Sequence, residues 1–332
     1  MKLLVITQVV DKTHPILGFF HRWLIEFSKH VDELHVIALF VGEHDLPNNV
    51  HVHSLGKEDG VGKFVYLWRF YKYIFTLKYD HVFVHMNQIY VLLGWKWWKL
   101  MGKKIGLWYV HREVNLSLRL ASMVVDTIFT TGSESFRLES KKVQYMGHGI
   151  APISLESSLY KDGQISLISI GRVSPVKRIE LIGEVAQTLG ARCVVVGGPG
   201  TKEDEAYFAD MVQEFEEVSF TGPLSHEKAL SYLRDAHFFV HVSKTGSTDK
   251  VVLEALLVGV PVISTGEAFK GMLSPYGLWS SDDSVEGIVS MVRAYLSKTI
   301  EERREDIFAL KREVAEKHAL DGLIDRIVKE YV

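Results

Sequence analysis

Short apolar runs alternate with amphipathic segments along the chain, and this alternation constrains the fold more than any other feature. The runs are apolar at most positions and rich in β-branched residues, which is typical of parallel strands covered on both faces. The segments between them are helix-like, so the sequence predicts repeated βαβ units and a doubly wound α/β fold. The predicted strands are residues 3–10, 33–41, 81–86, 104–111, 126–131, 143–146, 165–171, 192–198, 218–222, 237–243 and 261–265.

The length of 332 residues favours two domains. A stretch rich in glycine and serine at 147–164 interrupts the pattern, and a new strand follows it. We therefore predict an N-terminal domain over 1–152 and a second over 153–310, both Rossmann-like and facing a cleft. A C-terminal helix over 311–332 is expected to pack back on the first domain. In open parallel sheets ligands bind beyond the carboxyl ends of the strands, so residues after each strand are the site candidates.

Composition excludes several classes of protein. The net charge of −3 gives no reason to expect a nucleic-acid partner. The single cysteine, Cys193, excludes an intramolecular disulfide and a cysteine zinc site, and fits a reducing compartment. The N-terminal run is interpreted as a first strand and not as a signal peptide, and no run of 18 or more apolar residues could span a membrane. We expect a cytoplasmic protein.

A phosphate site is indicated in the second half by "ISIGRVSPVKRIELI". Ser174 suits a helix N-cap and Pro175 the first helical position, which would place Lys177 in the first helical turn. A cation is unfavourable there unless it shares an anion with the helix N-terminus. Together with Arg172 just after the strand, Lys177 could clamp a diphosphate. The alternative is two solvated surface cations.

Glycines that follow strands are weaker candidates. Gly197 and Gly198 could let the backbone approach a ligand closely, or could form a plain tight turn. Gly18 opens a predicted helix after the first strand, a geometry that could admit a phosphate or a sugar. No G-x-G-x-x-G opens a helix after the first strand of either half, which argues against a nicotinamide dehydrogenase.

The stretch "KTGSTDKVVLEALLVGVPVIST" (244–265) places a polar loop before a helix that starts near Asp249. Ser247 and Thr248 could cap that helix, whose N–H groups would face the cleft. Glu254 stands among apolar residues, so its carboxylate is either turned to solvent or paired. If it is buried it needs a partner, and hydroxyls of a ligand could supply one.

Four stretches together resemble the nucleotide-sugar domain of GT-B glycosyltransferases, specifically the retaining family 4. The resemblance is good over about 165–268 and looser in the first half, where it rests on Gly18, His111 and "YMGHGI". The stretches are "GRVSPVKRIELI", "VVVGGPG", "FTGPLSHEKALSYLRDAHFFVHVS" and "VVLEALLVGVPVIST".

The resemblance implies a donor nucleotide sugar on the second domain, an acceptor on the first, and metal-independent transfer with retention. It implies that Arg172 and Lys177 hold the diphosphate and neutralise the leaving nucleotide, which is the main need of such a reaction. Glu254 would accept hydrogen bonds from the ribose, and His111 would lie near the reacting face of the sugar. Further donor-binding positions would be Gly18, Gly198, Gly246, Ser247, Thr248 and Asp249.

The chain departs from the family pattern at two positions of the stretch 244–265. A third departure lies at the junction of the two predicted domains, where Ala151 stands in place of an acid. Gly246 stands where the family has a first acid, which contacts sugar hydroxyls, and Asp249 stands where it has a glycine. Asp249 either supplies the missing carboxylate or caps the helix. His85, His148 and His241 also border strands; a hydrogen-bonded structural role is the alternative to a catalytic one, and no zinc spacing is present.

Two aromatic and basic stretches, 63–79 and 94–104, indicate where the acceptor could come from. The second is expected to place Lys96, Lys99 and Lys103 on one helical face beside three tryptophans. Such mixtures suit a lipid headgroup zone, whereas the alternative is core helices with snorkelling lysines. The hypothesis is a peripheral protein on the inner face of the plasma membrane with a lipid-linked acceptor or growing glycan.

The sequence therefore predicts a nucleotide-sugar-dependent glycosyltransferase without cofactor or metal. Two alternatives stay open at this stage. One is a sugar-nucleotide epimerase or hydrolase of the same fold, and the other is a non-catalytic sugar-nucleotide binder in which Gly246 marks a degenerate site.

Overall fold

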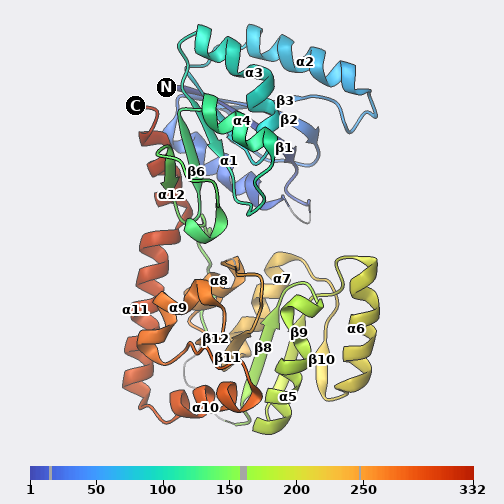
Figure 1. The fold of residues 1–332 in the computed structure, drawn as a ribbon, viewed down its shortest axis with the longest axis vertical. Helices are drawn as coiled ribbons and strands as arrows, with labels where there is room; N and C mark the ends of the chain where they lie inside the picture. Colours follow the sequence, from blue (N-terminus) through green and yellow to red (C-terminus); the bar gives the residue numbers. More distant parts are fainter. Residues whose placement is uncertain (15–16, 158–162, 247) are drawn as a thin grey trace. The chain divides into compact units, whose positions relative to one another are not determined.

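The structure is a computed structural model that describes residues 1–14, 17–157, 163–246 and 248–332. It divides into two compact units (Figure 1). The first unit comprises Met1–Ala151 and Lys317–Val332, and the second comprises Pro152–Glu316. Each unit has its own parallel sheet.

The sheet of the first unit has the strand order β3-β2-β1-β4-β5-β6-β7 and is parallel throughout. Its chain order reverses between β1 and β4, the switch point at which open sheets bind ligands. The strands are β1 (Lys2–Val10), β2 (Glu33–Val41), β3 (Val50–Ser54), β4 (His81–His85), β5 (Ile105–Trp108), β6 (Thr127–Thr130) and β7 (Val143–Tyr145).

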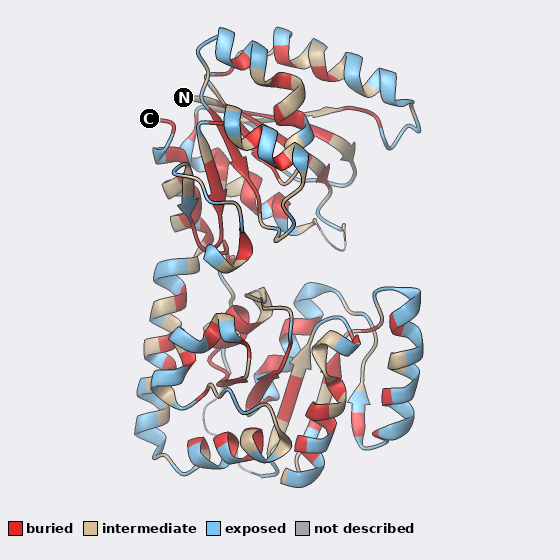
Figure 2. Ribbon diagram, in the orientation of Figure 1, coloured by how far each residue is buried: buried red, intermediate tan, exposed pale blue. Residues whose placement is uncertain are grey.

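Successive side chains of a strand point to opposite faces, and the two faces of this sheet support separate cores. One core packs Leu3 and Val5 of β1 under α1 (Phe19–His30) and α12 (Leu320–Lys329). The other packs Leu4 and Ile6 under α2 (Lys63–Thr76), α3 (Gln88–Leu100) and α4 (Leu116–Val124). Figure 2 shows the buried strands between these layers.

The C-terminal helix α12 is tied into the first unit by hydrogen bonds as well as by packing. Two backbone hydrogen bonds join Ile150 to the start of this helix. The Ile150 N–H donates to His318 O at 2.7 Å, and the Leu320 N–H donates to Ile150 O at 3.0 Å. The Tyr331 hydroxyl donates to Val82 O at 2.9 Å. A Cβ at Gly106 would lie 2.1 Å from that hydroxyl, so glycine at this position makes room for Tyr331.

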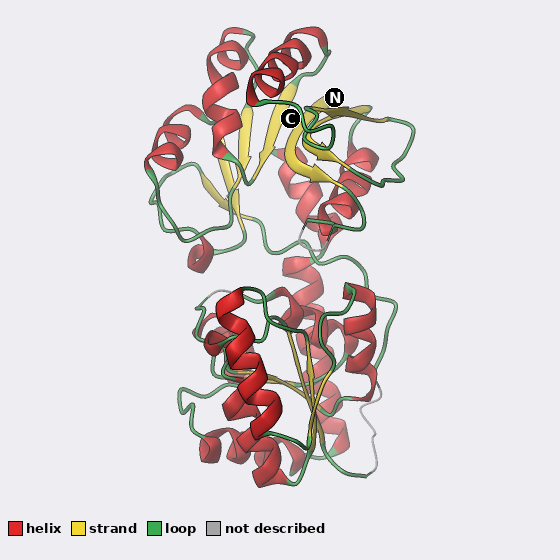
Figure 3. Cartoon of the chain, turned by 90° about the vertical axis from the view of Figure 1, so that its right-hand side faces the viewer, coloured by secondary structure: helices red, strands yellow, loops and turns green. Residues whose placement is uncertain are grey.

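The second unit has the strand order β10-β9-β8-β11-β12, with helices on both sides of the sheet (Figure 3). Its switch point lies between β8 and β11. The strands are β8 (Ser166–Ile170), β9 (Arg192–Val196), β10 (Val218–Phe220), β11 (Phe238–His241) and β12 (Val262–Ser264), and the helices are α5 (Ile179–Leu189), α6 (Lys202–Glu214), α7 (His226–Ser231), α8 (Lys250–Val258), α9 (Lys270–Leu273), α10 (Val285–Leu296) and α11 (Ile300–His318).

Every predicted strand is present, but the sequence prediction missed β3. Its sequence, VHVHS, alternates apolar and polar residues, because this edge strand is only partly buried. A search for continuous apolar runs does not detect such a strand. The edge carries a cluster of histidines, in which His35 Nδ1 of β2 lies 3.3 Å from His53 Nε2 of β3.

Candidate active site

An ion pair joins the loops that follow the two central strands of the second sheet. Lys177 follows β8, Asp249 follows β11, and the Lys177 ammonium bonds Asp249 Oδ2. These strands are neighbours in the sheet, and the chain order reverses between them. The two side chains therefore meet at the switch point, where the fold places a ligand.

The local structure around Lys177 corrects one sequence prediction. Residues Pro175–Lys177 form a single 3-10 turn, and Ser174 makes no capping bond with its side chain. Arg178 then adopts a left-handed conformation with φ of +54°, and α5 begins only at Ile179. Lys177 thus precedes α5 instead of lying in its first turn, so it does not oppose a helix dipole. Asp249 is the only described residue that accepts a bond from its ammonium.

Asp249 occupies the N-cap position of α8, but its side chain makes no capping bond. The prediction that it caps the helix is therefore wrong. Its Oδ2 instead accepts bonds from Lys177 and from His241 Nε2, the latter at 2.9 Å. Burial raises the pKa of this carboxyl, yet the His241 bond and the Lys177 charge outweigh burial and bring the pKa to about 2.

His241 is held rigidly at the end of β11. Its Nδ1 lies 3.0 Å from Ser264 Oγ, which in turn accepts the Gly266 N–H at 3.0 Å. The Phe269 ring packs edge-on against the imidazole with centroids 5.1 Å apart. His241 therefore presents Nε2 to Asp249 from a fixed ring, as expected of the hydrogen-bonded structural histidine that the sequence indicated.

Arg172 also follows β8 and remains half-exposed. A Cβ at Gly200 would lie 2.1 Å from Arg172 Cδ, so the arginine stem crosses that glycine closely. Arg172 Nε lies 3.6 Å from Asp204 Oδ2, a loose contact with an aspartate that also completes the capping box of α6. Its terminal nitrogens bond no described residue and are available to an anion.

The glycines near this site are explained by contacts within the protein. Gly197 has φ of +135°, and a Cβ there would lie 1.9 Å from Gly171 O. Gly198 faces Pro223, whose Cδ would lie 2.9 Å from an added Cβ. Gly246 has φ of +66°, a region that glycine enters without cost. The absent first acid thus coincides with a backbone conformation that an acidic residue would rarely adopt.

Glu254 is buried on α8, and its partner was not foreseen. His226 Nε2 lies 2.9 Å from Glu254 Oε1, although 28 residues separate them in sequence. Lys250, one turn before Glu254, has a pKa lowered to about 8 by burial, which the charge of Glu254 partly offsets. The carboxylate is therefore paired, as the burial of its neighbours required. Thr248 is half-buried before Asp249, while Ser247 lies outside the described residues.

Three predicted residues of the first unit lie at the end of a strand of its own sheet or in the segment after one. Gly18 immediately precedes α1, as predicted, and its amide donates to His14 O at 2.9 Å. His111 is exposed in the loop after β5, where its Nδ1 accepts the Glu113 N–H at 3.1 Å. His85 ends β4, and its ring stacks on Phe20 with centroids 4.0 Å apart.

Of the other predicted positions, His148 is buried with its Nδ1 3.1 Å from His318 Nδ1. It belongs to the junction with the C-terminal segment of the first unit. The structure therefore brings Lys177 and Asp249 together, with Arg172 after the same strand as Lys177. Asp249 and Glu254 are supported by His241, Ser264 and His226. No spacing in the sequence indicated these contacts.

Comparison with known families decides the class of the protein. Residues 153–307 match the model of the family described as glycosyl transferases group 1. These residues form a group 1 glycosyl transferase domain. This confirms the predicted family and enzyme class. No curated protein is significantly similar to this transferase in sequence.

Solved structures confirm that this glycosyl transferase has the GT-B fold. Anabaena HepE in complex with UDP has a TM-score of 0.74 at 14% identity, with 99% of each chain covered. Sucrose-phosphate synthase from Thermosynechococcus elongatus has a TM-score of 0.75 at 13% identity, with 100% of this chain and 98% of that chain covered. The lipopolysaccharide outer core galactosyltransferase WaaB has a TM-score of 0.71 at 12% identity, covering 99% and 100%. At these identities the likeness concerns the fold.

Proposed function

We propose that this glycosyl transferase moves a sugar from a nucleotide-sugar donor to a hydroxyl acceptor with retention at the anomeric carbon. The observation that carries the proposal is the placement of Lys177 at the switch point of the second sheet, with Arg172 on the same loop. A similar structure, HepE, was determined with UDP bound, which supports a nucleotide donor.

The chemistry of such a transfer suits these residues. When the sugar–phosphate bond breaks, negative charge grows on the departing nucleoside diphosphate. The Arg172 guanidinium and the Lys177 ammonium would stabilise that charge without moving, because they are already positioned. The acceptor hydroxyl would attack from the face on which the nucleotide leaves, so no protein nucleophile is needed.

The remaining donor contacts follow from position. Glu254 would accept hydrogen bonds from the ribose hydroxyls through the carboxylate oxygen that His226 does not bond. Gly18, Gly198, Gly246, Ser247 and Thr248 would line the donor, and His111 of the first unit would face the reacting sugar.

The hydrolase alternative receives no support from the nearest candidate for a catalytic triad. Ser264, His241 and Asp249 are linked in the order of a serine-hydrolase triad. However, Ser264 is completely buried, so its hydroxyl could not reach a substrate. The chain of bonds instead positions the Asp249 carboxylate.

The experiment offers UDP- and GDP-sugars with and without glucoside acceptors, and follows released nucleotide and glycoside product. A transferase releases nucleotide quickly only when the acceptor is present, and the product keeps the anomeric configuration of the donor. Rapid conversion of donor alone would indicate an epimerase or hydrolase. Saturable binding without turnover for any donor and acceptor would indicate a binding protein.

We also propose that the enzyme docks on an anionic membrane surface, through the outer faces of α2, α3 and α4. The apolar side chains on these faces recur at helical spacing, although the outer face of a surface helix is normally polar. They are Phe64, Trp68 and Phe75 on α2, Ile89, Trp97 and Leu100 on α3, and Leu116, Leu120 and Met123 on α4.

These three outer faces adjoin one another. The rings of Phe75 and Trp97 meet edge to face with centroids 5.2 Å apart, and the Tyr71 hydroxyl donates to Leu93 O, so α2 and α3 are joined. Helix α4 packs beside α3. Phe64 is 90% exposed and Leu100 79% exposed, which is unusual for large apolar residues at a protein surface.

The charge of these helices favours an anionic surface as the partner. The three helices contain Lys63, Arg69, Lys72, Lys96, Lys99 and Arg119 and no acidic residue, whereas the whole chain has a net charge of −3. Aromatic side chains mixed with cations suit the headgroup region of a bilayer. None of the described helices is long and apolar enough to cross a membrane, so the proposed association is peripheral.

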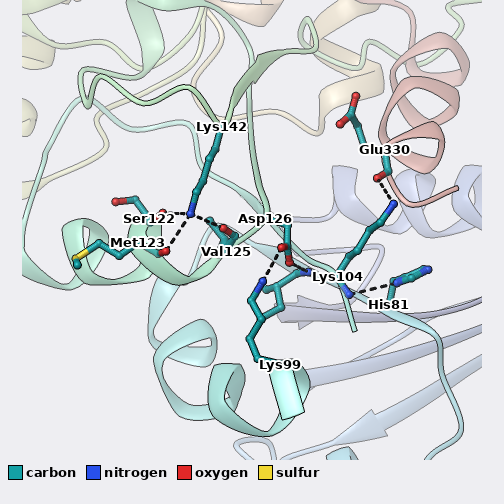
Figure 4. A network of polar contacts seen from close by, with 10 residues as sticks. His81, Lys99, Lys104, Ser122, Met123, Val125, Asp126, Lys142 and Glu330 are labelled. Atoms are coloured by element: carbon teal, nitrogen blue, oxygen red, sulfur yellow. Dashed lines mark hydrogen bonds and ion pairs between the residues drawn. The ribbon is translucent and has the colours of Figure 1, made fainter. Parts of the chain in front are cut away.

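The structure changes which lysines belong to this surface. Lys103 lies beyond the end of α3 and donates to Tyr79 O, so the prediction of one helical face for Lys96, Lys99 and Lys103 is wrong. Lys99 pairs with Asp126 at 2.5 Å (Figure 4). Lys72 and Lys96 are exposed and lie near the Trp68 and Trp95 rings.

A further inference from the structure

The departure from the family pattern in the loop after β11 has a chemical consequence that rests on the proposed function. Gly246 removes the carboxylate that would contact the donor sugar, while Asp249 introduces one three residues later. Whether Asp249 can take over depends on where its two carboxylate oxygens are, and on what already binds them.

The two oxygens of Asp249 have different surroundings. Both Lys177 and His241 bond Oδ2, and no described residue bonds Oδ1. The side chain is 22% exposed, so a ligand can reach it. A pKa of about 2 keeps the carboxylate ionised, and an ionised carboxylate only accepts hydrogen bonds. Oδ1 is therefore a fixed, charged acceptor without a donor among the residues that the structure describes.

Its location identifies the donor that it fits. A diphosphate held by the Lys177 ammonium would lie beside Asp249, because the two side chains are in contact. The sugar to be transferred is attached to that diphosphate. Sugar hydroxyls are hydrogen-bond donors, and the positive charge of Lys177 would offset the repulsion between the diphosphate and the carboxylate.

We propose that Asp249 is the residue that selects the donor sugar, with Oδ1 accepting a hydrogen bond from a sugar hydroxyl while Lys177 and His241 anchor Oδ2. His241 is a positioning residue, because it acts on the sugar only through Asp249. Ser264 and Phe269 fix the orientation of His241 in turn.

The test compares the affinity of each protein for UDP and GDP with its affinity for UDP-glucose, UDP-galactose and GDP-mannose, by isothermal titration calorimetry. In Asp249→Asn and Asp249→Ala the nucleotide sugar that binds wild type best should lose about tenfold or more in affinity, since a charged hydrogen bond is lost. The matching nucleoside diphosphate should bind as before or more tightly, because a competing anion has left Lys177.

Asp283→Asn is the matched control, since Asp283 is another ion-paired aspartate of the second unit. This variant should bind the nucleoside diphosphate and the nucleotide sugar with the affinities of wild type. Equal losses for nucleotide and nucleotide sugar in the Asp249 variants, or no loss for either, would overturn the selection role. His241→Phe should reproduce the selective loss more weakly if its role is positioning. If wild type itself binds no nucleotide, the proposed function fails, and that result is distinct from failure of the Asp249 assignment.

Discussion

Asp249 and Glu254 show how the acidic residues of the second unit depend on partners from distant parts of the chain. Asp249 is held by residues that follow β8 and end β11, and Glu254 by a residue of α7. The apolar neighbours of Glu254 in the sequence made a buried, paired carboxylate one of two interpretations, the other being a side chain turned to solvent. The sequence could not identify His226 or His241 as partners, since tertiary packing alone brings them together.

His53 of β3 supports a prediction about pH at the scale of one residue. Burial and the charges of His35 and His51 lower its pKa to about 4. Between about pH 6.5 and 4 the unfolded chain therefore binds more protons than the native protein, so the stability of the first unit should fall as the pH falls. Allowing for partial exposure, we expect about 1–3 kcal/mol from this histidine.

Urea unfolding at pH 7 and pH 4.5, followed by tryptophan fluorescence, measures this contribution. Six of the seven tryptophans lie in the first unit, at positions 23, 68, 95, 97, 98 and 108, so the signal reports on it. Between pH 7 and pH 4.5, His53→Gln should lose less stability than wild type. His30→Gln, on α1, should lose as much stability as wild type. Equal losses in wild type and His53→Gln would contradict the assignment.

At the scale of helices and strands, hydrophobic periodicity predicted the buried elements well and the surface elements less well. Strands covered on both faces are apolar at most positions and were found, while the half-buried β3 was not. In the same way, the helices over 63–79 and 94–104 were predicted, but only the structure separates Trp98, which is fully buried, from Trp97, which is exposed. That separation depends on packing against the sheet.

The membrane surface can be tested with the full chain and sedimented vesicles of neutral phosphatidylcholine, with or without phosphatidylserine. Wild type should bind the anionic vesicles. Lys72→Glu with Lys96→Glu should weaken binding at least about tenfold, at roughly 1 kcal/mol per cation removed. Lys202→Glu with Lys228→Glu, on exposed positions of the second unit, is the charge-matched control.

The apolar part of the surface needs its own comparison. Trp68→Ser with Leu100→Ser should also release the protein, while Phe308→Ser, at an exposed phenylalanine of α11, should not. Unchanged binding in both sets of variants would contradict the membrane assignment. A concentration-dependent dimer that Trp68→Ser abolishes would show instead that a second copy covers this face.

At the scale of the whole molecule, the chain forms two sheets whose central strands are connected in the same way. In each sheet the strand order reverses next to the first strand. The sequence predicted this architecture because each βαβ unit is locally encoded. The expectation that a C-terminal helix packs back on the first domain did not specify the contacts that residues 317–332 make, such as the Tyr331 hydroxyl on Val82 O. Gly106 leaves room for that tyrosine, but a glycine within a predicted strand does not indicate which distant residue will pack against it.

The central claim is that Lys177 at the switch point of the second sheet holds the donor diphosphate. The most direct measurement is the affinity of UDP and GDP for wild type, Lys177→Ala and the control Lys228→Ala, each confirmed to be folded by circular dichroism. We predict that Lys177→Ala loses at least about tenfold in affinity for the preferred nucleotide, since it removes a charged contact to phosphate, while Lys228→Ala binds like wild type. Unchanged nucleotide affinity in folded Lys177→Ala would contradict the claim.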